Sequence, residues 1–290
     1  MLQKATKRED FERYLHISYT QLSTYLKCPQ KYEFQYVKGL PWEFVPEYFP
    51  FGRAIHEAAK LFYRTLKETG QRVPLADLTQ YFKVTWDKET QGANIRYKEK
   101  QNRDTTREKG VQLVKVFYEN VTPQRIIGVE VPFSVDLVLE ETGEILPCKL
   151  SGIFDLIEAD EEDTLVIVEL KTSSKRFTDD QLDLDLQGTL YSYALKQVRF
   201  HTNGEDTLVR YDQLLKQKNP DMETYYAVKG NVDYTWAYHL VRKVLKAIEH
   251  EVFHPIPGWQ CKDCPYSKTC GPAKKSNNNI TLEQRPYQCL

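Results

Sequence analysis

The sequence predicts a mixed α/β fold, with a central mixed sheet flanked by helices. Up to about residue 124, apolar residues recur at helical spacing and no alternating strand pattern appears. From Arg125 the period changes to strand-like runs, and helices and further strands follow. An order of helices, a strand block, a helix and then mixed elements is typical of α+β or mixed α/β proteins.

The length of 290 residues and an apolar content of 41% allow one large domain. We expect one integrated domain with three regions. These are a helical region (1–124) with Cys28 and His56, a strand-rich core (125–230), and a C-terminal helix with a cysteine group and a polar tail (231–290).

Helix signals punctuate the first region. Ser18-Tyr-Thr-Gln21 is typical of a capping box, and Pro29 suits the first turn of the next helix. Gly39-Leu-Pro41 and Gly70 end helical patterns. The expected helical segments are about 18–27, 29–39, 51–68 and a highly charged stretch, about 75–120, with room for a flexible middle.

Strand signals follow. The expected strands are 126–131, 135–139, 145–157, 165–170, 207–215 and 223–228, with polar turns at 140–143 and 160–163. Helices are expected over 181–197 and 232–252, the second closed by Pro255 and Pro257. The polar tail after Cys270 is expected to be loosely ordered.

The charge balance gives no general sign of nucleic-acid binding, because 40 Lys and Arg residues face 41 Asp and Glu residues. A local basic stretch covers residues 96–109, and it is either a DNA-facing surface or a solvated face. The sequence has no run of 18 apolar residues and its charged start lacks a signal core. We therefore expect a soluble, cytoplasmic protein without a membrane partner.

The most informative motif is Glu169-Leu170-Lys171, which ends an otherwise apolar strand. If this strand forms a hairpin centred on Glu162, Asp155 falls opposite Glu169, and Lys171 shares their face. Two close carboxylates repel each other unless a cation lies between them, and a divalent ion suits oxygen ligands. The alternative is a cross-strand salt bridge on a solvated face. The apolar residues of the strand disfavour this alternative, because they indicate burial on both faces.

The cysteines form a second motif. Cys261, Cys264 and Cys270 follow the pattern C-x2-C-x5-C, which indicates a metal site more than disulfides. The candidates for a fourth ligand are Cys28, Cys148 and Cys289. Cys148 lies in a strand and is interpreted as a buried thiol, and Cys289 lies in the tail, so Cys28 is the best candidate. Zinc and an iron–sulfur cluster both suit four thiolates.

Taken together, these motifs resemble the PD-(D/E)xK nucleases of the RecB type. Among these, the chain resembles the iron–sulfur members, namely the CRISPR-associated RecB-like exonucleases and the AddB nuclease domain. The resemblance rests, in chain order, on Ser18–Tyr36 with Cys28, Phe51–His56, Gly152–Asp155, Glu169–Lys171, Gln187–Tyr191 and the cysteine triplet. It covers nearly the whole chain and implies a restriction-endonuclease-like core.

The resemblance also implies roles for individual residues. His56, Asp155, Glu169 and the Leu170 carbonyl would bind Mg²⁺ or Mn²⁺. Lys171 would position or activate the water, and Gln187 and Tyr191 would contact DNA near the scissile phosphate. The four cysteines would hold a [4Fe–4S] cluster, with Zn²⁺ as the alternative. The stretch 75–120 matches no motif of the family and could form a DNA channel or lid, or dock a partner.

The expected function is therefore that of a metal-dependent DNA exonuclease acting on single strands or free ends. Its setting would be DNA repair, recombination or CRISPR adaptation, with helicase or adaptation proteins as partners. The alternative is a DNA-binding or docking subunit of an integrase or helicase–nuclease complex, in which cleavage is secondary.

Overall fold

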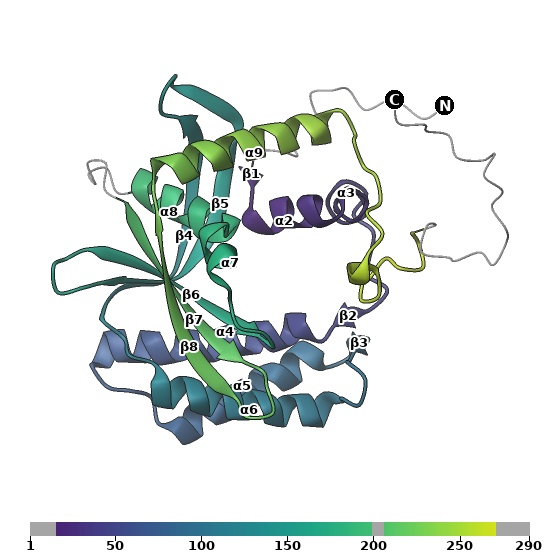
Figure 1. Ribbon diagram of the computed structural model, residues 1–290. Coiled ribbons are helices and arrows are strands. Elements are labelled where there is room, and N and C mark those ends of the chain that lie inside the picture. The colour runs from purple at the N-terminus through teal and green to yellow at the C-terminus, as the bar shows by residue number, and fades with distance from the viewer. Residues whose placement is uncertain (1–15, 199–205, 271–290) are drawn as a thin grey trace.

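A mixed sheet between two layers of helices forms the centre of the computed structural model, which describes residues 16–198 and 206–270 (Figure 1). The six-stranded sheet has the order β1-β5-β6-β7-β8, and β4 pairs with the other edge of β5. β5–β6 and β7–β8 are antiparallel, whereas β6–β7 and β1–β5 are parallel. The predicted fold class is confirmed.

The strands are β1 (His16–Ile17), β2 (Val45–Pro46), β3 (Ile95–Arg96), β4 (Arg125–Leu139), β5 (Glu144–Ala159), β6 (Leu165–Ser173), β7 (Thr207–Leu215) and β8 (Asp221–Lys229). The helices are α2 (Tyr19–Lys27), α3 (Pro29–Tyr32), the π-helical η1 (Glu33–Val37), α4 (Tyr48–Thr69), α5 (Leu75–Thr90), α6 (Arg103–Asn120), α7 (Asp179–Asp183), α8 (Leu186–Val198), α9 (Asn231–Glu249) and the 3₁₀ turn η2 (Trp259–Cys261).

The sheet separates two hydrophobic cores. On one face it packs against α2, α8 and α9, and on the other against α4, α5 and α6 (Figure 1). β6 contributes to both cores, since Ile167 faces the first and Val168 the second. A strand buried on both faces needs a continuous apolar run, which explains the sequence that precedes Glu169.

Several predicted elements are confirmed closely. The Ser18 side chain caps α2 in a capping box with Gln21, and Gly70 ends α4 in the left-handed conformation with φ 71°. β7 has the predicted bounds, and α4 begins three residues before the predicted start at Phe51.

The prediction of two strands over 126–139 is wrong, because β4 runs unbroken through Pro132. Among the described strands β4 pairs only with β5, so one side of β4 is free. A proline, which lacks an N–H, is tolerated on such an edge strand. The expectation of no strand before residue 125 is also wrong, since β1 joins the sheet and β2 pairs with β3.

The single helix predicted over 181–197 is also wrong, because α7 ends and α8 begins near Asp185. The buried ammonium of Lys229 binds the Leu182 and Asp183 carbonyls at the end of α7, at 3.0 and 2.6 Å. Asp185 Oδ2 then accepts the Gly188 N–H at 2.7 Å, as a helix N-cap does.

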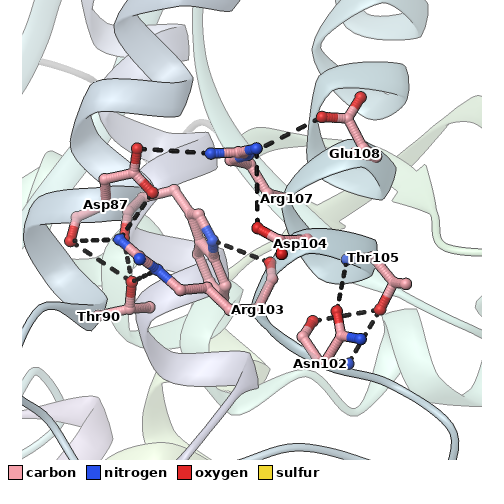
Figure 2. Close-up of polar contacts among 9 residues, drawn as sticks. Asp87, Thr90, Asn102, Arg103, Asp104, Thr105, Arg107 and Glu108 are labelled. Carbon is pink, nitrogen blue, oxygen red and sulfur yellow. Dashed lines mark hydrogen bonds and ion pairs between the residues drawn. The ribbon is translucent and has the colours of Figure 1, made fainter.

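Some side chains of the predicted basic stretch form ion pairs within the protein (Figure 2). Arg103 donates to Asp87 Oδ1 at 2.8 Å and to Thr90 Oγ1 at 3.0 Å, and Arg107 lies 3.6 Å from Asp87 Oδ2. The Trp86 indole donates to the Arg103 carbonyl at 3.2 Å. These two arginines therefore join α6 to α5, which for this part of the stretch favours the alternative to a DNA-facing surface. No helix in the described ranges has the length and hydropathy to cross a bilayer.

A buried ion network lies beneath α4. The Arg210 guanidinium on β7 bonds Glu158 Oε2 at 2.7 Å and Asp212 Oδ2 at 3.2 Å, and all three side chains are buried. Thr224 Oγ1 donates to the other Asp212 oxygen at 3.1 Å. Removing one member of such a network leaves uncompensated charge in the interior.

We predict that Arg210→Met lowers the free energy of unfolding by about 3–5 kcal/mol, measured by urea denaturation, because two carboxylates lose their buried partner. The matched control is Arg176→Met, which breaks pairs with Asp221 and Glu223 at the surface. That control is expected to lower the free energy of unfolding much less, because exposed ion pairs contribute little to stability. Similar small losses in both variants would contradict the assigned role of Arg210.

Candidate active site

The candidate site lies where β5 and β6 separate. Their ladder ends at Leu156↔Val168, and the next position places Asp155 opposite Glu169, as the hairpin centred on Glu162 predicts. Beyond this point β6 stays paired with β7 as far as Ser173. The Leu170 N–H, left without β5, donates to Asp155 Oδ2 at 3.2 Å. Since N–H and C=O of one strand residue point to the same side, the Leu170 carbonyl also faces this gap.

A second strand limits the gap from the other end. β1 pairs with β5 at Lys149 and Leu150, so residues 151–155 have no strand partner on that edge in the described part of the chain. An open cleft of about 410 Å³ lies here. It is lined by Ser18, Tyr19, Thr20, Arg53, His56, Glu57, Glu130, Gly152, Ile153, Asp155 and Tyr191.

Glu169, Lys171 and Gln187 form a closed triangle of hydrogen bonds. Lys171 Nζ donates to Glu169 Oε1 at 2.7 Å and to Gln187 Oε1 at 2.6 Å. Gln187 Nε2 donates to the same Glu169 oxygen at 2.7 Å. Glu169 is only 5% exposed, and its second oxygen, Oε2, is buried with no hydrogen-bond partner.

The charges of the site shift one another's pKa. Burial, helped by the nearby Asp155 carboxylate, raises the pKa of Glu169 to about 7, although Lys171 opposes this. Burial lowers the pKa of Lys171, but the Glu169 carboxylate outweighs it and the net pKa is raised. Lys171 therefore stays charged.

His56 on α4 faces Asp155, with Nδ1 3.4 Å from Oδ2. Burial raises the pKa of Asp155, but His56 and Lys171 reverse this and lower it overall. Burial lowers the pKa of His56, yet the Asp155 carboxylate outweighs that and raises it. The structure thus brings His56, Asp155, Glu169 and Lys171 to one place.

Tyr191 on α8 forms the opposite wall. Its ring packs edge-on against Phe133 and Phe154, with centroids 5.2 and 5.6 Å apart. A Cβ at Gly152 would lie 2.6 Å from Phe133 Cζ and 3.2 Å from the Tyr191 hydroxyl. The glycine of the Gly152–Asp155 motif therefore lets α8 approach β5.

Glu130 lines the cleft but was not among the predicted site residues. It lies on β4 between the pairs Val129↔Leu156 and Val131↔Phe154, which sets it across from Asp155. Burial and Asp155 raise its pKa, and its φ of 53° is uncommon outside glycine. The one sequence signal was an acid within the apolar run Val-Glu-Val.

Within residues 16–198 and 206–270, no three His, Cys, Asp or Glu side chains come close enough to hold one metal ion. The donor set nonetheless fits a hard cation. Buried Glu169 Oε2 lacks a partner, and an unpaired buried carboxylate oxygen is costly. A divalent ion beside Asp155 would satisfy it.

The predicted cysteine ligands lie within electrostatic range of one another, although in the described residues no three of their thiols are close enough to hold one metal ion. Burial raises the pKa of Cys270, and the thiols of Cys28, Cys264 and Cys261 raise it further. The N-terminal Cys28 thus lies within electrostatic range of the C-terminal triplet. Cys148 is apart from them, buried in the sheet core with its pKa raised to about 11 by burial.

Solved structures offer distant likenesses. The protein SSO0001 is 15% identical, with a TM-score of 0.40 over 92% of this chain and 94% of its own. A "Putative exonuclease" from Eubacterium rectale is 14% identical, with a TM-score of 0.48 over 99% of this chain and 97% of its own. Neither likeness is strong enough to indicate an activity, and no curated protein matches.

The family comparison is decisive. The profile of the PD-(D/E)XK nuclease superfamily matches residues 16–271, which includes every motif from Cys28 to Cys270. The central mixed sheet flanked by helices is the restriction-endonuclease-like architecture of that family. The chain belongs to the PD-(D/E)XK nuclease superfamily.

Proposed function

We propose that this protein is a metal-dependent DNA exonuclease that hydrolyses phosphodiester bonds in single-stranded DNA or at DNA ends. The observation that carries the proposal is the environment of Glu169. One of its oxygens is held by Lys171 and Gln187, and the other is buried without a hydrogen-bond partner, close to Asp155, which lines the open cleft.

The residues that would hold Mg²⁺ or Mn²⁺ are His56, Asp155, Glu169 and the carbonyl of Leu170. A bound divalent ion would polarise a phosphate and lower the pKa of water. His56 already contacts Asp155, and the Leu170 N–H fixes one Asp155 oxygen. These contacts orient the carboxylate toward the gap between β5 and β6.

Lys171 supplies fixed positive charge at the same place. Its ammonium is held by Glu169 and Gln187, and its raised pKa keeps it protonated. An oriented cation of this kind stabilises the negative charge that develops on a phosphate, and it can also position the attacking water. Gln187 and Tyr191, both on α8, would then contact DNA beside the scissile phosphate.

We further propose that the chain is of the RecB-like iron–sulfur type, with a [4Fe–4S] cluster on Cys28, Cys261, Cys264 and Cys270. The mutual electrostatic effect of these thiols supports this, and Zn²⁺ is the alternative occupant. The cellular setting we propose is DNA repair, recombination or CRISPR adaptation with helicase or adaptation proteins.

We predict that Glu169→Gln and Lys171→Met each lower Mg²⁺- or Mn²⁺-dependent digestion of end-labelled single-stranded DNA by at least about 100-fold, with the fold intact. The matched control is Glu162→Gln, an exposed carboxylate in the turn of the same hairpin. EDTA should abolish digestion by the wild type. Equal rates for wild type and both variants would refute the proposed site.

A second prediction separates an exonuclease from an endonuclease. Linear single-stranded DNA should be digested, whereas a circle of the same sequence should survive, because it presents no end. Blocking the 5′ or the 3′ end of the linear strand then gives the polarity. Equal digestion of circle and linear strand would show internal cleavage instead.

A third prediction concerns the cysteines. Protein purified without oxygen should be brown, absorb near about 400 nm and contain iron and sulfide. Cys28→Ser and Cys264→Ser should lose this absorbance, whereas Cys148→Ser should keep it, since that thiol is buried elsewhere. Colourless protein that contains stoichiometric zinc would assign the site to zinc.

A further inference from the structure

Three aromatic side chains gather at the start of α4. The rings of Trp42 and Phe49 lie 4.8 Å apart at their centroids, and those of Tyr48 and Phe49 lie 4.6 Å apart. Tyr48 is 42% exposed, and the other two are partly exposed. We call Trp42, Tyr48 and Phe49 the aromatic ledge.

The ledge is distinct from the aromatic core beneath it. Phe51 faces the hydrophobic core that α4 covers, where it is 1% exposed and packs edge-on against Phe82 and Trp86. Two layers of aromatic residues therefore flank the same helical turn. The inner layer stabilises the fold, whereas the outer one leaves ring surface in contact with solvent.

The ledge continues into the cleft of the candidate active site. Phe49 and His56 are seven residues apart, so they lie on one face of α4, separated by about 10 Å along its axis. Arg53, which is 63% exposed, lies between them and lines the cleft with His56. A Cβ at Gly52 would meet no heavy atom within 4 Å. An open surface thus leads from the ledge to His56.

The segment that carries Cys261, Cys264 and Cys270 holds the aromatic ledge in place. The carboxylate of Glu43, next to Trp42, accepts the N–H groups of Lys268 and Thr269, each at 3.2 Å. The Glu43 N–H donates to the Pro265 carbonyl at 3.2 Å. A stacking surface that is rigid before it binds loses less conformational entropy on binding.

We propose that the aromatic ledge stacks an unpaired base of the DNA strand whose backbone enters the cleft at His56. The inference rests on the proposed function and specifies its substrate as single-stranded. Every base presents a π-face that stacks on aromatic rings, so such a site accepts any sequence. In a duplex those faces are covered by neighbouring base pairs. Arg53, whose guanidinium also bonds Glu89 Oε2 at 2.6 Å, supplies a cation for the phosphate between the ledge and His56.

The test is a binding measurement without metal ions. Fluorescence anisotropy in EDTA compares a labelled oligothymidylate with an abasic oligomer of the same length, which keeps the phosphates and lacks the bases. The wild type should prefer the oligothymidylate. Tyr48→Ala should bind it about 5- to 150-fold more weakly, with unchanged affinity for the abasic oligomer.

Two further variants serve as controls. Tyr48→Phe keeps the ring and should bind like the wild type. Tyr226→Ala removes another exposed tyrosine, on β8 and 57% exposed, and should leave binding unchanged. Equal affinity of the wild type for both oligomers would overturn the proposal, as would a Tyr48→Ala variant that binds both like the wild type.

The wild-type comparison needs no variant, so it remains decisive if Tyr48→Ala fails to fold. Loss of both affinities together in a folded Tyr48→Ala protein would also overturn base stacking. The outcome is separable from the nuclease proposal. Base preference without metal-dependent cleavage would refute the nuclease alone, and cleavage without base preference would refute the ledge alone.

Discussion

The candidate active site depends on the separation of β5 and β6. β6 is buried on both faces and stays paired with β7 through Ser173, so it cannot follow β5 when the two separate beyond Val168. β1 holds β5 from the other end at Lys149 and Leu150. Between these contacts β5 and β6 are not paired with each other, so the Leu170 N–H is free to bond Asp155. The cleft, the carboxylate pair and the approach of α4 all follow from this gap.

The electrostatics of the gap explain its chemistry. Asp155 is balanced by His56 and an N–H, whereas Glu169 has only one oxygen satisfied, by Lys171 and Gln187. Burial, together with the nearby Asp155 carboxylate, raises the pKa of Glu169. A divalent cation would supply the missing positive charge. The fold therefore favours a cation in the gap between β5 and β6, next to the cleft that His56 and Asp155 line.

The sequence predicted the hairpin register of Asp155 and Glu169 because their turn is short and no bulge interrupts the ladder. It could not place Glu130, since β4 carries a register shift against β5 at Asp136/Val138, between the turn and Glu130. Counting from the turn alone would have set Glu130 opposite the wrong residue. The break at Asp185 was equally hidden, because it depends on Lys229, which is distant in sequence. Local sequence patterns thus predicted the hairpin register, whereas the contacts between residues distant in sequence could not be predicted.

The most direct test of the account is a titration of the protein with Mn²⁺ by calorimetry, in the absence of DNA. Wild type should bind the ion, and Glu169→Gln should bind it at least about tenfold more weakly, because one charged ligand is lost. Glu162→Gln, in the exposed turn of the same hairpin, should bind like the wild type. Equal Mn²⁺ affinity in wild type and Glu169→Gln would contradict the claim that the Glu169 carboxylate binds a metal ion.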